Sequence, residues 1–312
     1  MSDIESEMLL SKIARLYYLE DMNQNEIAEK FDINRVKVSR FLKKAREKKV
    51  VEIKINYPRE SHHEIERKIE KKYDLKECIV VPAYDSTQDT LKEMASALSS
   101  VLDRILDNND YLGVNWGLTL KGITDYLQPK RKIKINVVPI VGGLGKIETG
   151  IHTNSIAKNF ADIFGGTGYV INTPAILDTK EIKLALLEDS NTKEILELTK
   201  KLGVAIFSYS DIGQESSYSK YGLIRNEELN YLKKLNIVGD VNLDFLNDRG
   251  EHVPNKINDR VIALSISEIK KIKNVIGIAY GERKVPVTLA VLKGNIVNIL
   301  IIDKKIADSI IG

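Results

Sequence analysis

The first fifty residues show three short amphipathic helices separated by polar turns. Apolar side chains at Ile13 and Leu16 mark the inner face of a helix expected from about Glu5 to Leu19. A second short helix is expected after Asn23–Glu26, a segment with the form of a capping box. Asn34 is the expected N-cap of a third helix, whose apolar residues recur at helical spacing: Val38, Phe41, Leu42 and Ala45.

After Tyr57-Pro58 the chain changes character, because short apolar runs rich in Val and Ile alternate with segments of helical spacing. This order predicts a parallel sheet covered by helices, with a helix at 62–73 as the connector or first element. The expected strands are 79–81, 111–114, 133–141, 168–171, 204–208, 275–279 and 296–302. The expected helices between them include 91–106, 156–164, 194–202 and 228–235.

Charge is divided unevenly within the N-terminal segment. Residues 1–33 carry three Lys and Arg against eight carboxylates, whereas residues 34–54 carry nine Lys and Arg against two Glu. A basic block of this density is the electrostatic footprint of a phosphate-contacting surface. Taken alone, the block also fits a solvated lysine-rich helix face.

The third helix combines this basic block with helix-turn-helix spacing. Its apolar residues face the core, which turns its basic residues outward, as in a recognition helix that lies in the major groove of DNA. A generic three-helix bundle is the alternative, and 50–55 would be the wing or exit strand. The expected DNA-contacting residues are Arg35, Lys37, Ser39, Arg40 and Lys43.

Composition bounds the other classes of protein. The single cysteine, Cys78, lies in an apolar run and offers no intramolecular disulfide. The N-terminal residues lack a signal-peptide pattern, and no apolar run reaches the roughly 18 residues of a membrane span. We therefore expect a cytoplasmic protein with no membrane partner.

Three loops in the second segment follow expected strands and carry glycine or cationic residues. They are 113–119, which contains Gly117 and Thr119; 139–145, followed by a helix start at 152–155; and 279–284, which ends on Lys284. Loops beyond the carboxyl ends of parallel strands are the usual ligand sites of such sheets. Each also has a plain structural explanation: a glycine turn, an ordinary N-cap and a solvated lysine.

Several of these segments together resemble the SorC family of sugar-responsive bacterial regulators. In the N-terminal segment the resemblance lies in 13–18, 24–28 and 38–46. In the second segment it lies in 113–119, 138–143, 239–240, 258–262 and 281–284, so it spans most of the chain.

The resemblance implies an organisation and a function. It implies a helix-turn-helix domain over 1–56 and an effector-binding and oligomerisation domain over 57–312, the latter similar in fold to phosphosugar isomerases and deaminases. It implies a repressor of a carbohydrate-metabolism operon, with operator DNA and a noncovalently bound phosphorylated sugar or polyol as ligands, no cofactor, and a dimer or tetramer. The residues implied for the effector are Gly117, Thr119, Gly142, Gly143, Thr153, Asn154, Asp240, Asn258, Arg260 and Lys284.

Three other chemistries compete with this function. A phosphosugar isomerase would need acid and base groups, and its candidates lack a recognisable catalytic spacing: Asp211, Asp240, Glu148 and His152. The four histidines are scattered without metal-ligand spacing. Val141 stands where the deoxyribose-phosphate-responsive branch of the family carries a lysine, and a valine has no amine to form an imine. We expect no enzyme activity and no metal.

Overall fold

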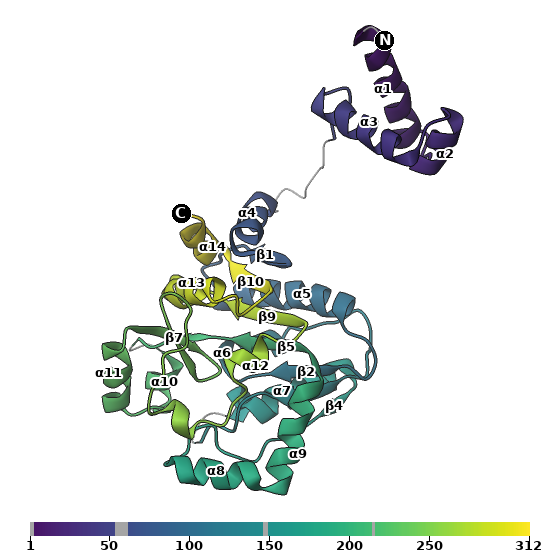
Figure 1. Ribbon diagram of the computed structural model, residues 1–312. Coiled ribbons are helices and arrows are strands. Elements are labelled where there is room, and N and C mark those ends of the chain that lie inside the picture. Colours follow the sequence, from purple (N-terminus) through teal and green to yellow (C-terminus); the bar gives the residue numbers. More distant parts are fainter. Residues whose placement is uncertain (1–2, 54–61, 146–148, 214–215) are drawn as a thin grey trace. The chain divides into compact units, whose positions relative to one another are not determined.

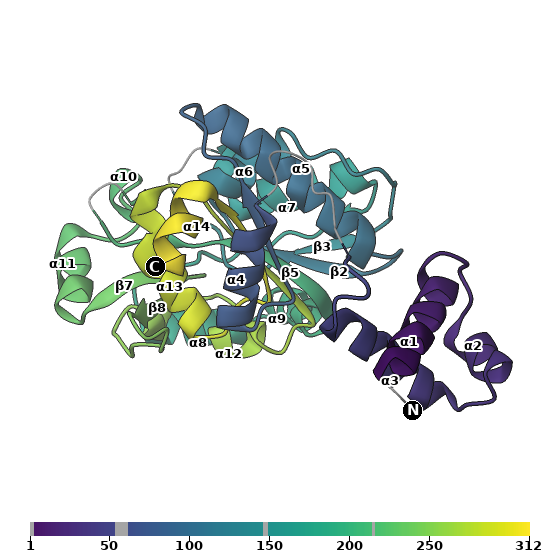
Figure 2. The same cartoon turned by 90° about the horizontal axis from the view of Figure 1, so that it is seen from above.

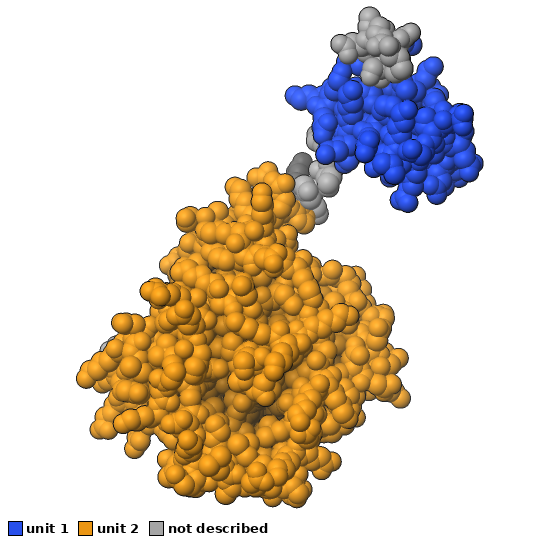
Figure 3. All heavy atoms as spheres, in the orientation of Figure 1, with its two compact units in different colours: residues 1–59 blue, residues 60–312 orange. Residues whose placement is uncertain are grey.

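The computed structural model describes residues 3–53, 62–145, 149–213 and 216–312 of the 312-residue chain. The chain forms two compact units, residues 1–59 and residues 60–312 (Figure 3). The domain boundary expected between residues 56 and 57 lies outside the described residues.

The first unit contains the three expected helices: α1 (Asp3–Tyr18), α2 (Gln24–Lys30) and α3 (Arg35–Glu47). The capping box at the start of α2 is present, because the Asn23 side chain accepts from the Glu26 N–H at 3.1 Å and the Asn23 N–H donates to the Glu26 carboxylate at 2.7 Å. Asn34 caps α3 by accepting the Lys37 N–H at 2.8 Å. The strand expected at 50–55 is wrong for residues 50–53, which form a bend at 50–51 followed by irregular chain; its remainder lies outside the described residues.

The second unit is built on a parallel sheet of seven strands (Figures 1 and 2). Its order is β1-β10-β9-β5-β2-β3-β4, and every neighbouring pair is parallel. The strands are β1 (Glu77–Val81), β2 (Tyr111–Val114), β3 (Asn136–Pro139), β4 (Thr167–Gly168), β5 (Leu202–Ser208), β9 (Asn274–Ala279) and β10 (Ile299–Asp303). The predicted parallel α/β architecture is therefore confirmed.

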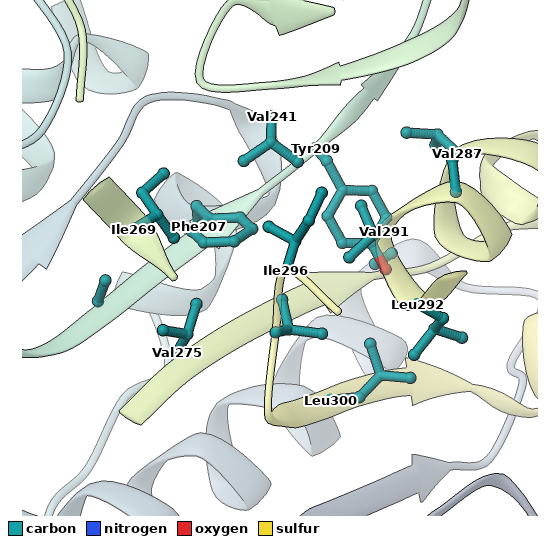
Figure 4. Packing of buried hydrophobic residues seen from close by; sticks show 14 of the residues in the cluster. Phe207, Tyr209, Val241, Ile269, Val275, Val287, Val291, Leu292, Ile296 and Leu300 are labelled. Atoms are coloured by element: carbon teal, nitrogen blue, oxygen red, sulfur yellow. The ribbon is translucent and has the colours of Figure 1, made fainter. Parts of the chain in front are cut away.

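Both faces of this sheet are buried, as the near-continuous apolar strands require. Along β5, Val204 and Ile206 pack on one face with residues of α5 (Thr87–Ile105), α6 (Leu118–Thr124) and α7 (Thr153–Phe164). Ala205 and Phe207 belong to the core on the other face. Figure 4 shows Phe207 among its neighbours there. That face is covered by α4 (His63–Tyr73), α12 (Ile266–Ile269), α13 (Val285–Lys293) and α14 (Lys304–Ile311).

A small antiparallel sheet, which the sequence analysis missed, lies beside the main sheet. It consists of β6 (Ser210–Asp211), β7 (Ile237–Val241) and β8 (Asp244–Asn247). The β7–β8 turn places Asn242 at φ 58° and Leu243 at φ 67°. Both angles are left-handed, as a two-residue hairpin turn requires, but Asn-Leu is not the Asn-Gly sequence that announces such a turn.

The remaining elements connect these layers. They are α8 (Lys180–Glu188), α9 (Ser190–Leu198), α10 (Ser217–Lys220), α11 (Asn226–Lys234) and the 3-10 turns η1 (Thr149–Ile151), η2 (Thr199–Lys201), η3 (Asn258–Arg260) and η4 (Glu282–Lys284). Among the helices of the described residues, none combines the length and the apolar character that crossing a membrane requires.

Candidate functional site

A cavity lies at the carboxyl ends of β2, β5 and β9, which are neighbours in the sheet. The order of the strands reverses between β2 and β5, since β3 and β4 extend the sheet to one side of β2 and β5 begins the other side. Such a switch point is where open α/β sheets bind ligands. The lining residues are Asn115 to Thr119, Ser208, Ser210, Asp211, Ser217, Tyr218, Asp240, Tyr280, Arg283 and Lys284.

Asn115 joins two of the loops that line the cavity. Its side-chain amide donates to the Ser208 carbonyl at 2.9 Å, and its side-chain oxygen accepts the Ser208 N–H at 3.3 Å. Gly117 follows at φ 131°, a conformation that favours glycine, and a Cβ there would lie 3.2 Å from the Ser208 hydroxyl. The β2 loop is thus held close to β5.

Lys284 supplies a cation to the cavity. Its Nζ donates to the Thr119 hydroxyl at 3.4 Å and lies 5.8 Å from the centre of the Tyr280 ring. The side chain is partly accessible to solvent, yet burial of the amine lowers its pKa to about 8, an effect that Asp211 opposes. An amine in this setting favours an anionic neighbour.

Asp240 and Tyr218 bring two neighbouring buried polar groups to the cavity, which interact with each other without a hydrogen bond of standard geometry. The Asp240 Oδ2 accepts the Leu243 N–H at 2.8 Å, while Oδ1 has no hydrogen-bond partner among the described residues. The buried Tyr218 hydroxyl also lacks a hydrogen bond of standard geometry among the described residues. Burial raises the pKa of Asp240 to about 7, although the nearby Tyr218 hydroxyl acts to lower the pKa of that carboxyl. Buried polar atoms without partners are rare in proteins, and a bound ligand with hydroxyl groups can satisfy them.

Asp211 and Arg283 form an ion pair in the cavity lining. The Arg283 Nε lies 3.2 Å from the Asp211 Oδ1, and the Asp211 Oδ2 accepts the Gly213 N–H at 3.1 Å. Arg283 is half-exposed, whereas Asp211 is buried. With Lys284 and Asp240, two cations and two carboxylates line one cavity.

Of the residues that the sequence analysis expected at the effector, Gly117, Thr119, Asp240 and Lys284 meet in this cavity. Other lining residues were not expected there: Asn115, Trp116, Ser208, Tyr218, Tyr280 and Arg283. Asn115 and Ser208 could have been predicted, because they lie at the ends of expected strands. Tyr218 could not, because it comes from α10, a helix of four residues with no recognisable sequence signal.

The expectation that the Gly142 and Gly143 N–H groups surround a phosphate is wrong for this structure. The Gly142 N–H donates to the Ile262 carbonyl at 2.9 Å, and the Gly143 N–H donates to the Thr173 carbonyl at 2.7 Å. Gly143 borders a different hollow, which Arg260 also lines. Because the N–H groups of Gly142 and Gly143 already donate to distant backbone carbonyls, neither is available to bind a phosphate.

The remaining expected residues also lie away from the cavity lining. Thr153 is fully buried, and the Asn154 side chain exchanges hydrogen bonds of 3.0 Å with the backbone of Ile171. The Asn258 amide donates to the Leu243 carbonyl at 2.8 Å. Arg260 donates to the Leu177 carbonyl at 2.6 Å and is paired with Glu228. Asn154, Asn258 and Arg260 brace the fold, since their polar groups bind the chain itself. The buried Thr153 hydroxyl has no hydrogen-bond partner among the described residues.

The first unit carries a second candidate site, on the outer surface of α3. Its expected DNA-contacting residues are all exposed, as the helical spacing predicts: Arg35, Lys37, Ser39, Arg40 and Lys43. Val38, Leu42 and Ala45 are buried on the opposite side of α3. The Lys43 Nζ lies 3.8 Å from the Glu47 Oε1. Both side chains are exposed, and an ion pair of this kind contributes little to stability.

Comparison with known proteins places this chain among regulators. Residues 57–312 match the protein family described as "Putative sugar-binding domain". The deoxyribonucleoside regulator of Bacillus subtilis (strain 168) is 30% identical, and the sorbitol operon regulator of Klebsiella pneumoniae is 27% identical; in each case the match covers 99% of both chains. The crystal structure of the full-length sorbitol operon regulator SorC from Klebsiella pneumoniae has a TM-score of 0.76 and 28% identity, covering 99% of this chain and 100% of that one. This chain belongs to the SorC family of sugar-responsive transcriptional regulators.

Proposed function

We propose that this regulator reads operator DNA through α3 and that Arg35, Lys37, Ser39, Arg40 and Lys43 make the contacts. Their exposure on the side of α3 opposite its buried residues supports this assignment. An arginine can donate two hydrogen bonds to a guanine, whereas a lysine at a phosphate adds charge without sequence preference. One helix-turn-helix covers one half-site, so we propose a dimer or tetramer on a site with internal symmetry.

We further propose that the effector is a phosphorylated sugar or polyol held noncovalently in the cavity. The observation that carries this proposal is the Lys284 amine beside Thr119, facing a cavity that also holds the buried polar groups of Asp240 and Tyr218. Lys284 would bind the phosphate, and Asp240 and Tyr218 would bind sugar hydroxyls. Gly142 and Gly143 have no part in it, because their N–H groups are occupied.

Operator DNA and a phosphorylated sugar, as the two ligands, suggest which genes this chain controls and where it acts. The relatives are named for sorbitol and deoxyribonucleosides, which supports control of a carbohydrate-metabolism operon, and we propose that this chain acts as a repressor. A DNA partner implies a cytoplasmic protein. Val141 is fully buried and carries no amine, which supports noncovalent binding at that position.

Regulation rather than catalysis is proposed for the cavity. Of the acid and base candidates weighed from the sequence, Asp211 and Asp240 line the cavity, and Asp211 is already paired with Arg283. His152 caps α7 instead, since its Nδ1 accepts the Asn154 N–H at 3.3 Å and burial lowers its pKa. Glu148 lies outside the described residues. The relatives are likewise named as regulators.

DNA binding is tested with Arg40→Ala and Lys43→Ala in the full-length chain, using fluorescence anisotropy on duplexes selected from random sequence. Arg40→Ala should cost about 1–3 kcal/mol and relax preference at one base pair, because a bidentate guanine contact is lost. Lys43→Ala should weaken binding to all sequences alike and lessen the salt dependence. Both variants should keep the thermal shift that a phosphosugar produces, since α3 is outside the cavity-bearing unit.

Wild-type operator affinity in Arg40→Ala would contradict the assignment of the DNA contacts to α3.

A panel of phosphorylated sugars and polyols in the same thermal-shift assay identifies the effector. A ligand at 100 times its dissociation constant adds about 2.7 kcal/mol to the free energy of unfolding. No shift from any phosphorylated compound, alongside a shift from an unphosphorylated one, would contradict the phosphate assignment.

A further inference from the structure

The first turn of α3 exposes an apolar residue that the fold does not use. Val36 is 60% exposed and stands between the exposed Arg35 and Lys37. Within the described part of the first unit, it is not among the apolar residues that pack into the core. A β-branched side chain is also a weaker helix former than alanine or lysine. Neither helix formation nor packing therefore explains a valine at this position.

Val36 lies on the surface that α3 presents outward, in the first turn of the helix. Val36, Arg40 and Lys43 are four and three residues apart, so they form one strip along the helix. At about 100° per residue, this strip lies opposite the buried residues Val38 and Leu42. The apolar methyl groups thus sit in line with the proposed DNA contacts, at the N-terminal end that enters the groove most deeply in helix-turn-helix proteins.

We infer that Val36 contacts the 5-methyl group of a thymine in the major groove and so specifies one T·A pair in each half-site. The inference rests on the proposed binding of DNA by α3. The thymine methyl is the apolar group that the major groove displays, and it marks T·A against the other pairs. The basic neighbours Arg35 and Lys37 would hold phosphates or base edges on either side, which brings the valine against the bases.

The test removes the methyl groups from both partners. Full-length protein selects its site from random duplexes, and each thymine of that site is then replaced by deoxyuridine, which lacks only the 5-methyl group. One thymine per half-site should prove sensitive, with affinity falling about fourfold for each methyl removed. Val36→Ala removes the contact from both half-sites, so it should bind the thymine duplex about sixteenfold more weakly and no longer distinguish thymine from deoxyuridine at that position.

A matched control separates this contact from a general effect of exposed apolar residues. Leu19, just beyond the end of α1, is 78% exposed, and Leu19→Ala should keep the full thymine preference. Val36→Ala should unfold at the wild-type temperature or above, since the replaced side chain is exposed and alanine favours the helix.

Two other results overturn the inference in distinguishable ways. Specific binding in which Val36→Ala keeps the wild-type thymine preference, or in which no thymine is sensitive, rejects the valine contact while leaving DNA binding by α3 intact. Selection that enriches no sequence at all rejects the proposed DNA reading itself, and the valine contact with it.

Discussion

The loops after two neighbouring strands, β2 and β3, look alike in sequence and differ in the structure. Both strands end in an apolar run, and both lead into glycine, at Gly117 and at Gly142–Gly143. The β2 loop lines the cavity. Glycine N–H groups of both loops donate to distant backbone carbonyls, but the β3 loop also forms β-bridges with distant chain, and neither of its two glycines lines the cavity. A glycine after a parallel strand therefore indicates close backbone approach, and only the neighbouring side chains decide whether a ligand or the chain itself approaches.

The difference arises from segments far away in the sequence. Val141 pairs with Ala263 and Gly143 pairs with Pro174 in isolated bridges, which bring two distant stretches of chain against the β3 loop. Gly117 also donates its N–H to a distant carbonyl, that of Ile151 at 3.2 Å, but among the described residues a Cβ on Gly117 would meet only the Ser208 hydroxyl within 4 Å. Local sequence gives no sign of these pairings.

Alanine at each loop sharpens the comparison, and the largest effect is expected at Gly142. A Cβ on Gly142 would lie 2.6 Å from the Ala175 nitrogen, so backbone must move, whereas the strain at Gly117 comes from its φ of 131°. Gly142→Ala should lower the free energy of unfolding by about 3 kcal/mol in urea titrations. Gly117→Ala should weaken effector binding about tenfold, because the β2 loop must rearrange beside Thr119.

The two variants are separated by measuring both quantities in each. The folded fraction of Gly142→Ala should bind the effector as the wild type does. If Gly142→Ala instead weakens the effector more than Gly117→Ala, the β3 loop belongs to the site and the contrast between the loops is wrong.

Sequence patterns predicted the elements that depend on local chemistry. The caps at Asn23 and Asn34 and the buried strip of α3 were all correctly expected, because capping and helical periodicity act within a few residues. The parallel strands were also recognisable, since burial on both faces leaves apolar runs such as β5.

The cavity was only partly predictable, because its residues come from distant segments. Gly117, Thr119 and Lys284 follow strands, and their position at the sheet edge is implied by the fold. Tyr218 enters from α10, and Asp240 from a small sheet that the sequence does not announce. Asn154 and Arg260 have chemistry suited to a ligand, but the structure gives their polar groups to the backbone of Ile171 and Leu177.

A smaller effect is expected from Asp240, whose buried carboxyl group distinguishes the cavity from the satisfied β3 loop. Burial raises the pKa of Asp240 from 3.8 to about 7. Because the folded-state pKa is raised, the stability contributed by the protonated form is complete below pH 3.8 and is lost as the pH rises through about 7. Relative to Asp240→Asn, the ligand-free wild type should therefore lose stability between pH 5 and pH 8, on the order of 2–3 kcal/mol.

Urea unfolding of both proteins at each pH measures this difference directly. Asn keeps an oxygen that can accept the Leu243 N–H and carries no charge to bury, so it isolates the ionisation of Asp240. A difference in stability that does not change with pH would show that Asp240 stays ionised throughout this range.

Calorimetry of a phosphorylated effector and its unphosphorylated parent tests the proposed site most directly. Lys284→Ala should weaken the phosphorylated compound by about 1.5–3 kcal/mol and leave the parent nearly unchanged, because the lost hydrogen bond is charge-assisted. Lys183 is the matched control, since burial also lowers its pKa but its Nζ donates to the Asn258 carbonyl at 3.3 Å, away from the cavity. Lys183→Ala should bind both compounds as the wild type does. Equal phosphosugar affinity in Lys284→Ala and the wild type would contradict the assignment of the phosphate to this cavity.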